Sequence, residues 1–230
     1  MRRLILFDID GTLLSTNGAA KRAFHRALVS VYGTAGPIAR HPFDGKTDPQ
    51  IARELLRLAG LADPAVERGF SALWPTYLRE LAGELARPEY VTLVYPGVRE
   101  LLARLESMKD DVLVGLLTGN LEQGAALKLR SAGLGASFRF GAFGSDCERR
   151  DGLPAVAVER ARSLAGREFA GADVVVIGDT PHDITCGQAL GVRAIGVATG
   201  RHETDALMEA GAHAAVADLS NTDAVLELLL

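Results

Sequence analysis

The residues of this sequence that could do chemistry fall in three short polar runs, and each run directly follows an apolar segment. The runs are Asp8-Ile9-Asp10-Gly11-Thr12, Thr118-Gly119-Asn120 and Gly178-Asp179-Thr180-Pro181-His182-Asp183. Carboxylates that share one crevice repel each other by terms of kcal/mol scale unless a cation offsets their charge. If the fold gathers the three runs, their carboxylates predict a bound metal with ligands from Asp8, Asp10, Asp179 and Asp183.

The type of ligand indicates which metal this would be. Carboxylate oxygens without a His or Cys cluster suit Mg²⁺, which keeps several waters and usually shares its coordination shell with phosphate. Gly11, Gly119 and Gly178 would let the backbone approach a phosphate and present N–H groups to it, although glycine-rich turns are also common without a ligand. The sequence therefore predicts a Mg²⁺ cofactor and a small phosphorylated substrate.

Alternating strands and helices are expected to position these runs. Apolar segments rich in β-branched residues predict strands covered on both faces, at residues 4–7, 112–117, 138–143, 174–177 and 193–197. Helical patterns lie between them, at residues 98–105, 121–129, 153–164 and 184–190. This alternation implies an α/β fold with a doubly wound parallel sheet. The ligand crevice of such a sheet lies beyond the carboxyl ends of its strands, where the three polar runs begin.

One segment, residues 16–92, interrupts the alternation. It shows no convincing buried strand but has amphipathic helical patterns at residues 19–32, 48–59 and 64–87. Helices inserted directly after the first strand predict an all-helical second domain, with residues 1–15 and 93–230 forming the core domain. Tyr95-Pro96-Gly97 is a turn signal that returns the chain to the sheet.

Composition narrows the class of partner. Lys and Arg number 25 against 29 Asp and Glu, so a net charge of -4 gives no general affinity for nucleic acid or acidic membranes. The two cysteines, Cys147 and Cys186, lack metal-ligand spacing and fit a reducing compartment. Asp8 interrupts the first apolar run too early for a secretory signal, and no later run reaches membrane-spanning length. We expect a cytoplasmic protein with a small soluble partner, and its oligomeric state stays open.

Each polar run, taken singly, can also be explained by a structural role without any function. Asp, Thr and Ser after a strand often cap the next helix, and Asp-Gly is a common turn. Three runs that converge on one edge of a sheet are harder to explain in this way than any one of them.

The same runs resemble motifs of a known enzyme superfamily. Asp8-Ile9-Asp10-Gly11-Thr12-Leu13 looks like the first motif of the haloacid dehalogenase (HAD) superfamily, Thr118 in LLTGN like its second, and residues 178–183 like its fourth. The resemblance covers nearly the whole chain, including the helical insertion, which stands at the position of the superfamily's C1 cap. Within the superfamily, the chain resembles phosphoglycolate phosphatases and beta-phosphoglucomutases.

This resemblance implies a phosphoaspartyl mechanism. Asp8 would attack phosphorus, and Asp10 would protonate the leaving oxygen and then deprotonate the hydrolytic water. Thr118 would donate a hydrogen bond to a phosphoryl oxygen. The metal would be held by Asp8, the backbone carbonyl of Asp10 and Asp179, with Asp183 supporting the water shell or the cation of the third motif. Dehalogenases lack the second acidic residue and need no metal, so Asp10 favours phosphoryl chemistry.

The third motif, a Lys or Arg that neutralises the phosphoryl group, is the least clear. Many relatives carry Lys followed by Pro, and this sequence has no such pair. The run from Ser145 to Pro154 falls in the right interval. Arg150 is the preferred residue because it stands at the start of the next helix, and Arg149 remains a rival.

Substrate choice is expected in the helical insertion, at the loop Phe43-Asp44-Gly45-Lys46-Thr47-Asp48, which resembles the cap specificity loop of these relatives. Lys46 or Thr47 could meet an anionic or hydroxyl group of the substrate. Alternatively, Thr47 or Asp48 only caps the helix that starts at Pro49. Gly119 and Asn120 complete the predicted substrate contacts.

The leading hypothesis is a Mg²⁺-dependent phosphatase of a small, phosphoglycolate-like metabolite. A hexose phosphate mutase would share every catalytic residue and differ in its cap. Phosphonate cleavage would require Lys46 to form an imine with the substrate. A non-catalytic module that binds phosphate or a partner is the alternative outside enzymes, and the presence of both Asp8 and Asp10 disfavours it.

Overall fold

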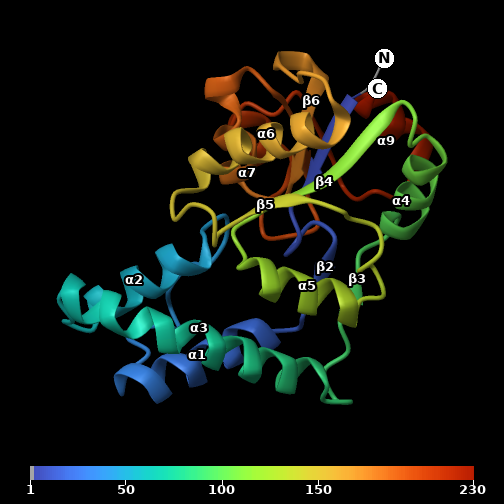
Figure 1. The fold of residues 1–230 in the computed structure, drawn as a ribbon. Coiled ribbons are helices and arrows are strands. Elements are labelled where there is room, and N and C mark those ends of the chain that lie inside the picture. The colour runs from blue at the N-terminus through green and yellow to red at the C-terminus, as the bar shows by residue number, and fades with distance from the viewer. Residues whose placement is uncertain (1–2) are drawn as a thin grey trace.

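A parallel sheet covered by helices forms the larger part of the molecule, and three further helices lie beside one end of it (Figure 1). The computed structural model describes residues 3–230. The sheet has six strands in the order β5-β4-β1-β6-β7-β8, and every neighbouring pair is parallel. The strands are β1 (Arg3–Phe7), β4 (Val112–Thr118), β5 (Gly141–Phe143), β6 (Val174–Gly178), β7 (Arg193–Val197) and β8 (Ala214–Val216). The predicted α/β class with a doubly wound parallel sheet is confirmed.

The register of the central strands brings their carboxyl ends together. Phe7, at the end of β1, pairs with Leu116 of β4 on one side and Ile177 of β6 on the other. The chain order reverses at β1, since β4 and β6 flank it and later strands extend the sheet beyond β6. The polar runs after β1, β4 and β6 therefore leave the sheet at the same edge, beside the switch point where such folds bind ligands.

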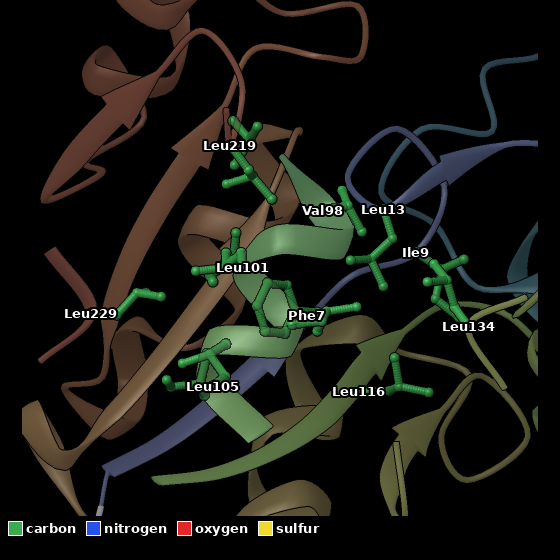
Figure 2. Close-up of a cluster of buried hydrophobic side chains, with 14 of the residues drawn as sticks. Phe7, Ile9, Leu13, Val98, Leu101, Leu105, Leu116, Leu134, Leu219 and Leu229 are labelled. Atoms are coloured by element: carbon green, nitrogen blue, oxygen red, sulfur yellow. The ribbon is translucent and has the colours of Figure 1, made fainter. Parts of the chain in front are cut away.

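Both faces of β1 are buried, which explains its continuous apolar run. Ile5 and Phe7 belong to one hydrophobic cluster, and Leu4 and Leu6 belong to another on the opposite face. In the first cluster Phe7 packs with Leu101 of α4 (Figure 2). That cluster is completed by α4 (Val98–Ser107), α5 (Glu122–Ser131) and α9 (Thr222–Leu229). The second is covered by α6 (Leu153–Ala165) and α7 (Pro181–Cys186).

Several short elements differ from the sequence prediction. The predicted strand at 138–143 is limited to Gly141–Phe143, and the predicted helix at 184–190 is divided into α7 and a 3₁₀ turn, Gln188–Leu190. A capping box between Thr180 and Asp183 starts α7 at Pro181, earlier than the apolar pattern indicates. Strand β8 and the helices α8 (Thr204–Glu209) and α9 were not predicted. Elements of three to eight residues carry too few periods of apolar alternation to be recognised.

The inserted helices form a hydrophobic cluster of their own. They are α1 (Ala19–Tyr32), α2 (Asp48–Leu58) and α3 (Asp63–Leu85), within two residues of the predicted bounds. Phe24, Leu55 and Tyr77 are among the buried side chains that they share. Two short antiparallel strands, β2 (Leu14–Ser15) and β3 (Leu93–Val94), pair where the chain leaves the sheet and returns to it. Division into domains at residues 15/16 and 92/93 stays a prediction. Within residues 3–230 no helix has the length and apolarity needed to cross a membrane.

An ionic cluster around Glu84 joins α1 to the end of α3. The Glu84 side chain is 1% exposed and receives Arg22 Nε at 2.6 Å, Arg87 Nε at 3.2 Å and a guanidinium nitrogen of Arg26. Its replacement by alanine would leave the arginines unpaired at a half-buried site, and we expect a loss of about 2–4 kcal/mol in the free energy of unfolding. Chemical denaturation measures this loss. Glu80→Ala, one turn earlier on α3, is the control and should change stability by about 0.5 kcal/mol or less.

Candidate active site

A cavity of about 220 Å³ lies at the carboxyl edge of the sheet, between the sheet and the inserted helices. The strand ends and α5 contribute charged and polar side chains to its wall: Asp8, Asp10, Thr118, Asn120, Lys128 and Asp179. The inserted segment contributes side chains that include Lys21, Phe24, Phe43, Lys46 and Tyr77. The structure therefore brings residues of the three polar runs and of the predicted specificity loop to one cavity.

Three carboxylates form an acidic group, and two of them, Asp8 and Asp179, line this cavity. Asp8, Asp179 and Asp183 are buried, and each offers an oxygen within 4.8 Å of the others. Burial, followed by the charge of Asp183, raises the pKa of Asp8 to about 7 and that of Asp179 to about 9. These raised pKa values mean that the protein alone does not compensate the charge of the group. A bound cation would supply that compensation, so the residues could hold a metal ion.

The surroundings of Asp179 leave one of its oxygens available. Oδ1 accepts a hydrogen bond from Thr12 Oγ1 at 3.1 Å, whereas Oδ2 accepts none from the described residues. Two glycines make room for this carboxylate, because a Cβ on Gly200 would lie 1.8 Å from Oδ2 and one on Gly11 would lie 2.2 Å from it. Gly11 also has a φ of +87°, which favours glycine. This narrow space around a partly unpaired carboxylate fits a ligand of a small cation.

Asp183, in contrast, uses both of its oxygens within the protein. Oδ2 accepts hydrogen bonds from the Thr180 backbone N–H at 2.9 Å and from Thr180 Oγ1 at 2.7 Å. Oδ1 pairs with Arg150 Nη2. Asp183 thus caps α7 and orients Arg150. Of its two predicted roles, this favours support of the third-motif cation over support of the water shell of the metal.

The two candidate cations of the third motif lie in different places. Arg150 is 7% exposed, and its Nη2 donates to Asp8 Oδ1 at 3.0 Å and to Asp183. Arg149 is 81% exposed and pairs with Asp151 at the surface. Buried Arg150 Nε has no acceptor among the described residues, so one donor of the guanidinium is unused. The structure places Arg150, and not Arg149, beside the predicted nucleophile.

The side chain of Asp10 lies outside the three-carboxylate group. Its Oδ2 accepts hydrogen bonds from Asn120 Nδ2 at 2.8 Å and from Lys128 Nζ at 2.6 Å. The resemblance assigns only the backbone carbonyl of Asp10 to the metal, and the position of the Asp10 side chain beside Lys128 and Asn120 is consistent with that. The sequence prediction missed Lys128, although its place on the buried face of α5 with Gly124, Ala125 and Leu129 was a usable signal.

Thr118, Gly119 and Asn120 have separate environments. Thr118 is fully buried, and its Oγ1 accepts from Asn120 Nδ2 at 2.8 Å. The Thr118 hydroxyl hydrogen is therefore free to be donated to a ligand. Gly119 instead meets the specificity loop, because a Cβ there would lie 2.0 Å from the Lys46 carbonyl oxygen, and its own carbonyl accepts from the Asp48 N–H at 2.8 Å.

The specificity loop is held mainly by contacts within the protein. Thr47 accepts from the Gln50 N–H as the N-cap of α2 and donates to the Glu148 carbonyl at 2.6 Å, so its hydroxyl has the capping role. Lys46 lines the cavity but is paired with Glu54. Asp48 Oδ2 accepts from the Leu121 N–H at 2.8 Å, and burial raises the pKa of Asp48 to about 6.

Comparison with known proteins agrees with this geometry. The family model described as haloacid dehalogenase-like hydrolase matches residues 5–188. A protein of Dickeya dadantii named "Probable phosphatase IndB" is 30% identical over 91% of this chain and 87% of its own length. A phosphoglycolate phosphatase of Pseudomonas syringae pv. tomato is 28% identical over 86% of this chain and 70% of its own length.

Solved structures show the same fold. A hydrolase from Pseudomonas syringae superposes with a TM-score of 0.73 over 99% of both chains, at 20% identity. The family match spans the strand ends that carry Asp8, Thr118 and Asp179. This chain therefore belongs to the haloacid dehalogenase-like hydrolase family and is a phosphoric monoester hydrolase.

Proposed function

We propose that this enzyme hydrolyses a small, phosphoglycolate-like phosphorylated metabolite with the help of Mg²⁺, through an aspartyl phosphate on Asp8. One observation carries the proposal: two aspartates two residues apart have opposite environments in one cavity. Asp8 lies with the acidic group and Arg150, whereas Asp10 lies with Lys128 and Asn120. Carboxylates whose environments differ in this way can divide the roles of nucleophile and proton carrier between them.

Mg²⁺ would be held by Asp8, Asp179 and the backbone carbonyl of Asp10, and would neutralise charge at the phosphoryl group. The donor set supports this assignment, since it consists of oxygens alone and Asp179 Oδ2 accepts no hydrogen bond from the described residues. Arg150 adds a second positive charge beside Asp8.

The reaction needs two displacements at phosphorus. In the first, a carboxylate oxygen of Asp8 forms a bond to phosphorus, the ester bond breaks, and the leaving oxygen takes a proton from Asp10. In the second, water gives a proton to Asp10 and attacks phosphorus, and the bond to Asp8 breaks. Thr118 donates its hydroxyl hydrogen to a phosphoryl oxygen during both displacements.

The size and charge of the cavity support the proposed substrate class. A volume of about 220 Å³ suits a metabolite of few atoms. Lys21 and Arg150 line the cavity and favour an anionic substrate. The curated relative from Pseudomonas syringae, a phosphoglycolate phosphatase, supports the same class.

Of the two alternative reactions, the site gives less support only to phosphonate cleavage. Phosphonate cleavage through an imine needs a lysine that is free to attack a substrate carbonyl, whereas Lys46 Nζ is paired with Glu54. A hexose phosphate mutase uses the same catalytic groups, so the fate of the phosphoryl group must separate it from a phosphatase.

A substrate panel tests the proposal. The purified protein is incubated with Mg²⁺ and either 2-phosphoglycolate, a generic aryl phosphate, or β-glucose 1-phosphate primed with glucose 1,6-bisphosphate. Free phosphate is measured by molybdate assay and sugar isomers by NMR. Free phosphate from phosphoglycolate, lost on addition of EDTA, is the expected result. Formation of glucose 6-phosphate without free phosphate would select the mutase, and hydrolysis that survives EDTA would refute the metal-dependent mechanism.

Arg150 and Arg149 offer a matched pair of variants. Arg150→Met should lower kcat/KM by about 10²–10⁴-fold, because it removes a cation that contacts the nucleophile. Arg150→Lys retains the charge and should recover part of this loss, even if the methionine variant folds poorly. Arg149→Met should keep kcat/KM within about twofold of the wild type, since surface substitutions have small effects. Equal losses in the Arg149 and Arg150 variants would contradict the assignment.

A further inference from the structure

The mechanism described above gives no role to Lys128, although this buried cation contacts the proposed proton carrier. We propose that Lys128, together with Asn120, is a positioning residue. The two hold Asp10 Oδ2 against the wall of the cavity, so that Oδ1 is the oxygen that transfers the proton to and from the reacting groups. This inference rests on the proposed phosphatase function and deepens it.

The contacts form a closed set around Asp10 Oδ2. Lys128 Nζ lies 2.6 Å from this oxygen and 2.5 Å from Asn120 Oδ1, and Asn120 Nδ2 lies 2.8 Å from the same carboxylate oxygen. Asn120 Nδ2 also reaches Thr118 Oγ1 at 2.8 Å. Asp10, Lys128 and Asn120 thus each contact the other two, which restricts rotation of the Asp10 carboxyl group.

The position of Lys128 in the fold explains why it can do this. It lies in the last turn of α5, on the buried face of that helix, and only 3% of the residue is exposed. An ammonium group in such a place is costly unless anionic and polar acceptors surround it. Those acceptors are Asp10 and Asn120, and the charge of Asp48 on the inserted segment lies close enough to interact as well.

The two oxygens of Asp10 are consequently different. Oδ2 accepts two N–H donors, whereas Oδ1 accepts no hydrogen bond from the described residues. The Asp10 side chain is 43% exposed, in contrast to 8% for Asp8, so its free oxygen is accessible from the cavity. The donors on Oδ2 therefore leave Oδ1 to carry the proton.

Proton transfer through Oδ1 balances both displacements. As the ester bond breaks, its electron pair stays on the leaving oxygen, which receives the proton of Oδ1, and Asp10 becomes a carboxylate paired with Lys128. When water attacks the aspartyl phosphate, its proton goes to Oδ1 and the electron pair of the broken bond returns to Asp8. No oxidant, reductant or further reactant is needed.

The dependence of rate on the leaving group distinguishes positioning from a purely structural ion pair. An alkoxide leaving group needs a proton in the transition state, but p-nitrophenolate does not. The variant is Lys128→Met, which has a similar length and no charge. Rapid mixing with Mg²⁺ follows the first turnover, because later turnovers also require Asp10 as a base.

For Lys128→Met, we expect first-turnover release of p-nitrophenolate to change by less than about fivefold. Release of the alcohol from 2-phosphoglycolate or ethyl phosphate should fall by about 10²-fold or more, which is the usual contribution of a positioned acid. Asn120→Ala removes one donor and should give the same pattern with a smaller loss, so the inference stays testable if the lysine variant folds poorly. Asp10→Asn should show the full pattern.

Lys109→Met is the matched control, because it makes the same chemical change at an exposed lysine remote from the cavity. It should leave both first-turnover rates unchanged. Equal loss on aryl and alkyl esters in the Lys128 and Asn120 variants, or no loss on either, would overturn the positioning role and leave the phosphatase proposal intact. A wild-type protein that releases no phosphate from any of these esters would refute the phosphatase proposal itself.

Discussion

Replacement of Asp8 by asparagine is expected to abolish phosphate release, with a fall in kcat of about 10⁴-fold or more, because an amide cannot replace a carboxylate nucleophile. The Asp8 carboxyl group contacts Arg150 and shares the acidic group with Asp179 and Asp183. Asparagine has nearly the same shape, so the loss reports chemistry and not packing. Release of phosphate from an aryl phosphate in the presence of Mg²⁺ measures it, and wild-type protein quenched in acid should retain phosphate on Asp8.

Stability measurements separate this effect from misfolding. Burial and the charge of Asp183 raise the pKa of Asp8 to about 7, so ionised Asp8 disfavours the metal-free fold at higher pH. At pH 8 without metal, Asp8→Asn should therefore unfold at the wild-type temperature or above it. Asp223→Asn is the control, since that side chain is 81% exposed, and it should keep full activity. Activity of Asp8→Asn within tenfold of the wild type would contradict the covalent mechanism.

Without metal, the free energy of unfolding of the wild-type protein is expected to fall as the pH rises from about 5 to 9. Burial and Asp183 raise the pKa of Asp179 from 3.8 to about 9, so the folded protein binds this proton more tightly than the unfolded chain does. The resulting stabilisation is complete below pH 3.8 and is lost as the pH rises towards 9. Asp8 and Asp48 act in the same direction, up to about pH 7 and 6 respectively.

Groups whose pKa values are lowered in the folded protein do not oppose this loss of stability between about pH 5 and 9. The hydrogen bond from Arg57 lowers the pKa of Asp63, so the contribution of Asp63 is lost only as the pH falls below its ordinary value of 3.8. With roughly 2–4 °C per kcal/mol for a protein of this size, a loss of a few kcal/mol from these groups is sufficient to lower the unfolding temperature in EDTA by about 10 °C or more.

Mg²⁺ should reverse this loss at pH 8 and have little effect at pH 5. The cation binds carboxylates in their ionised form, so it stabilises the folded state where those groups have lost their protons. Thermal unfolding with EDTA or Mg²⁺ across the pH range measures both effects. Asp179→Asn should flatten the pH dependence and weaken the response to Mg²⁺. An unfolding temperature in EDTA that is constant or rises over this window would show that the acidic group is already compensated by the protein.

Local pattern was sufficient to predict the larger elements. The strands β1, β4, β6 and β7 and the inserted helices were found within two residues, because apolar periodicity reports burial and buried elements are long enough to show it. The positions of Asp8, Thr118 and Asp179 at one edge followed from this, since parallel strands end together. Short elements such as the edge strand β8 and the helix α8 were not predicted, because they contain too few residues to show a period of apolar residues.

What the sequence by itself determined is the sheet, the inserted helices and the edge at which the polar runs meet. Only the tertiary structure decided how the charges there are divided. It separates Asp10 from the other three carboxylates and pairs it with Lys128, 118 positions away, and it buries Arg150 beside Asp8 while Arg149 reaches the solvent. The physical reason is that periodicity depends on neighbours within a few residues, whereas the partner of a buried charge is set by whichever distant segment the fold brings against it.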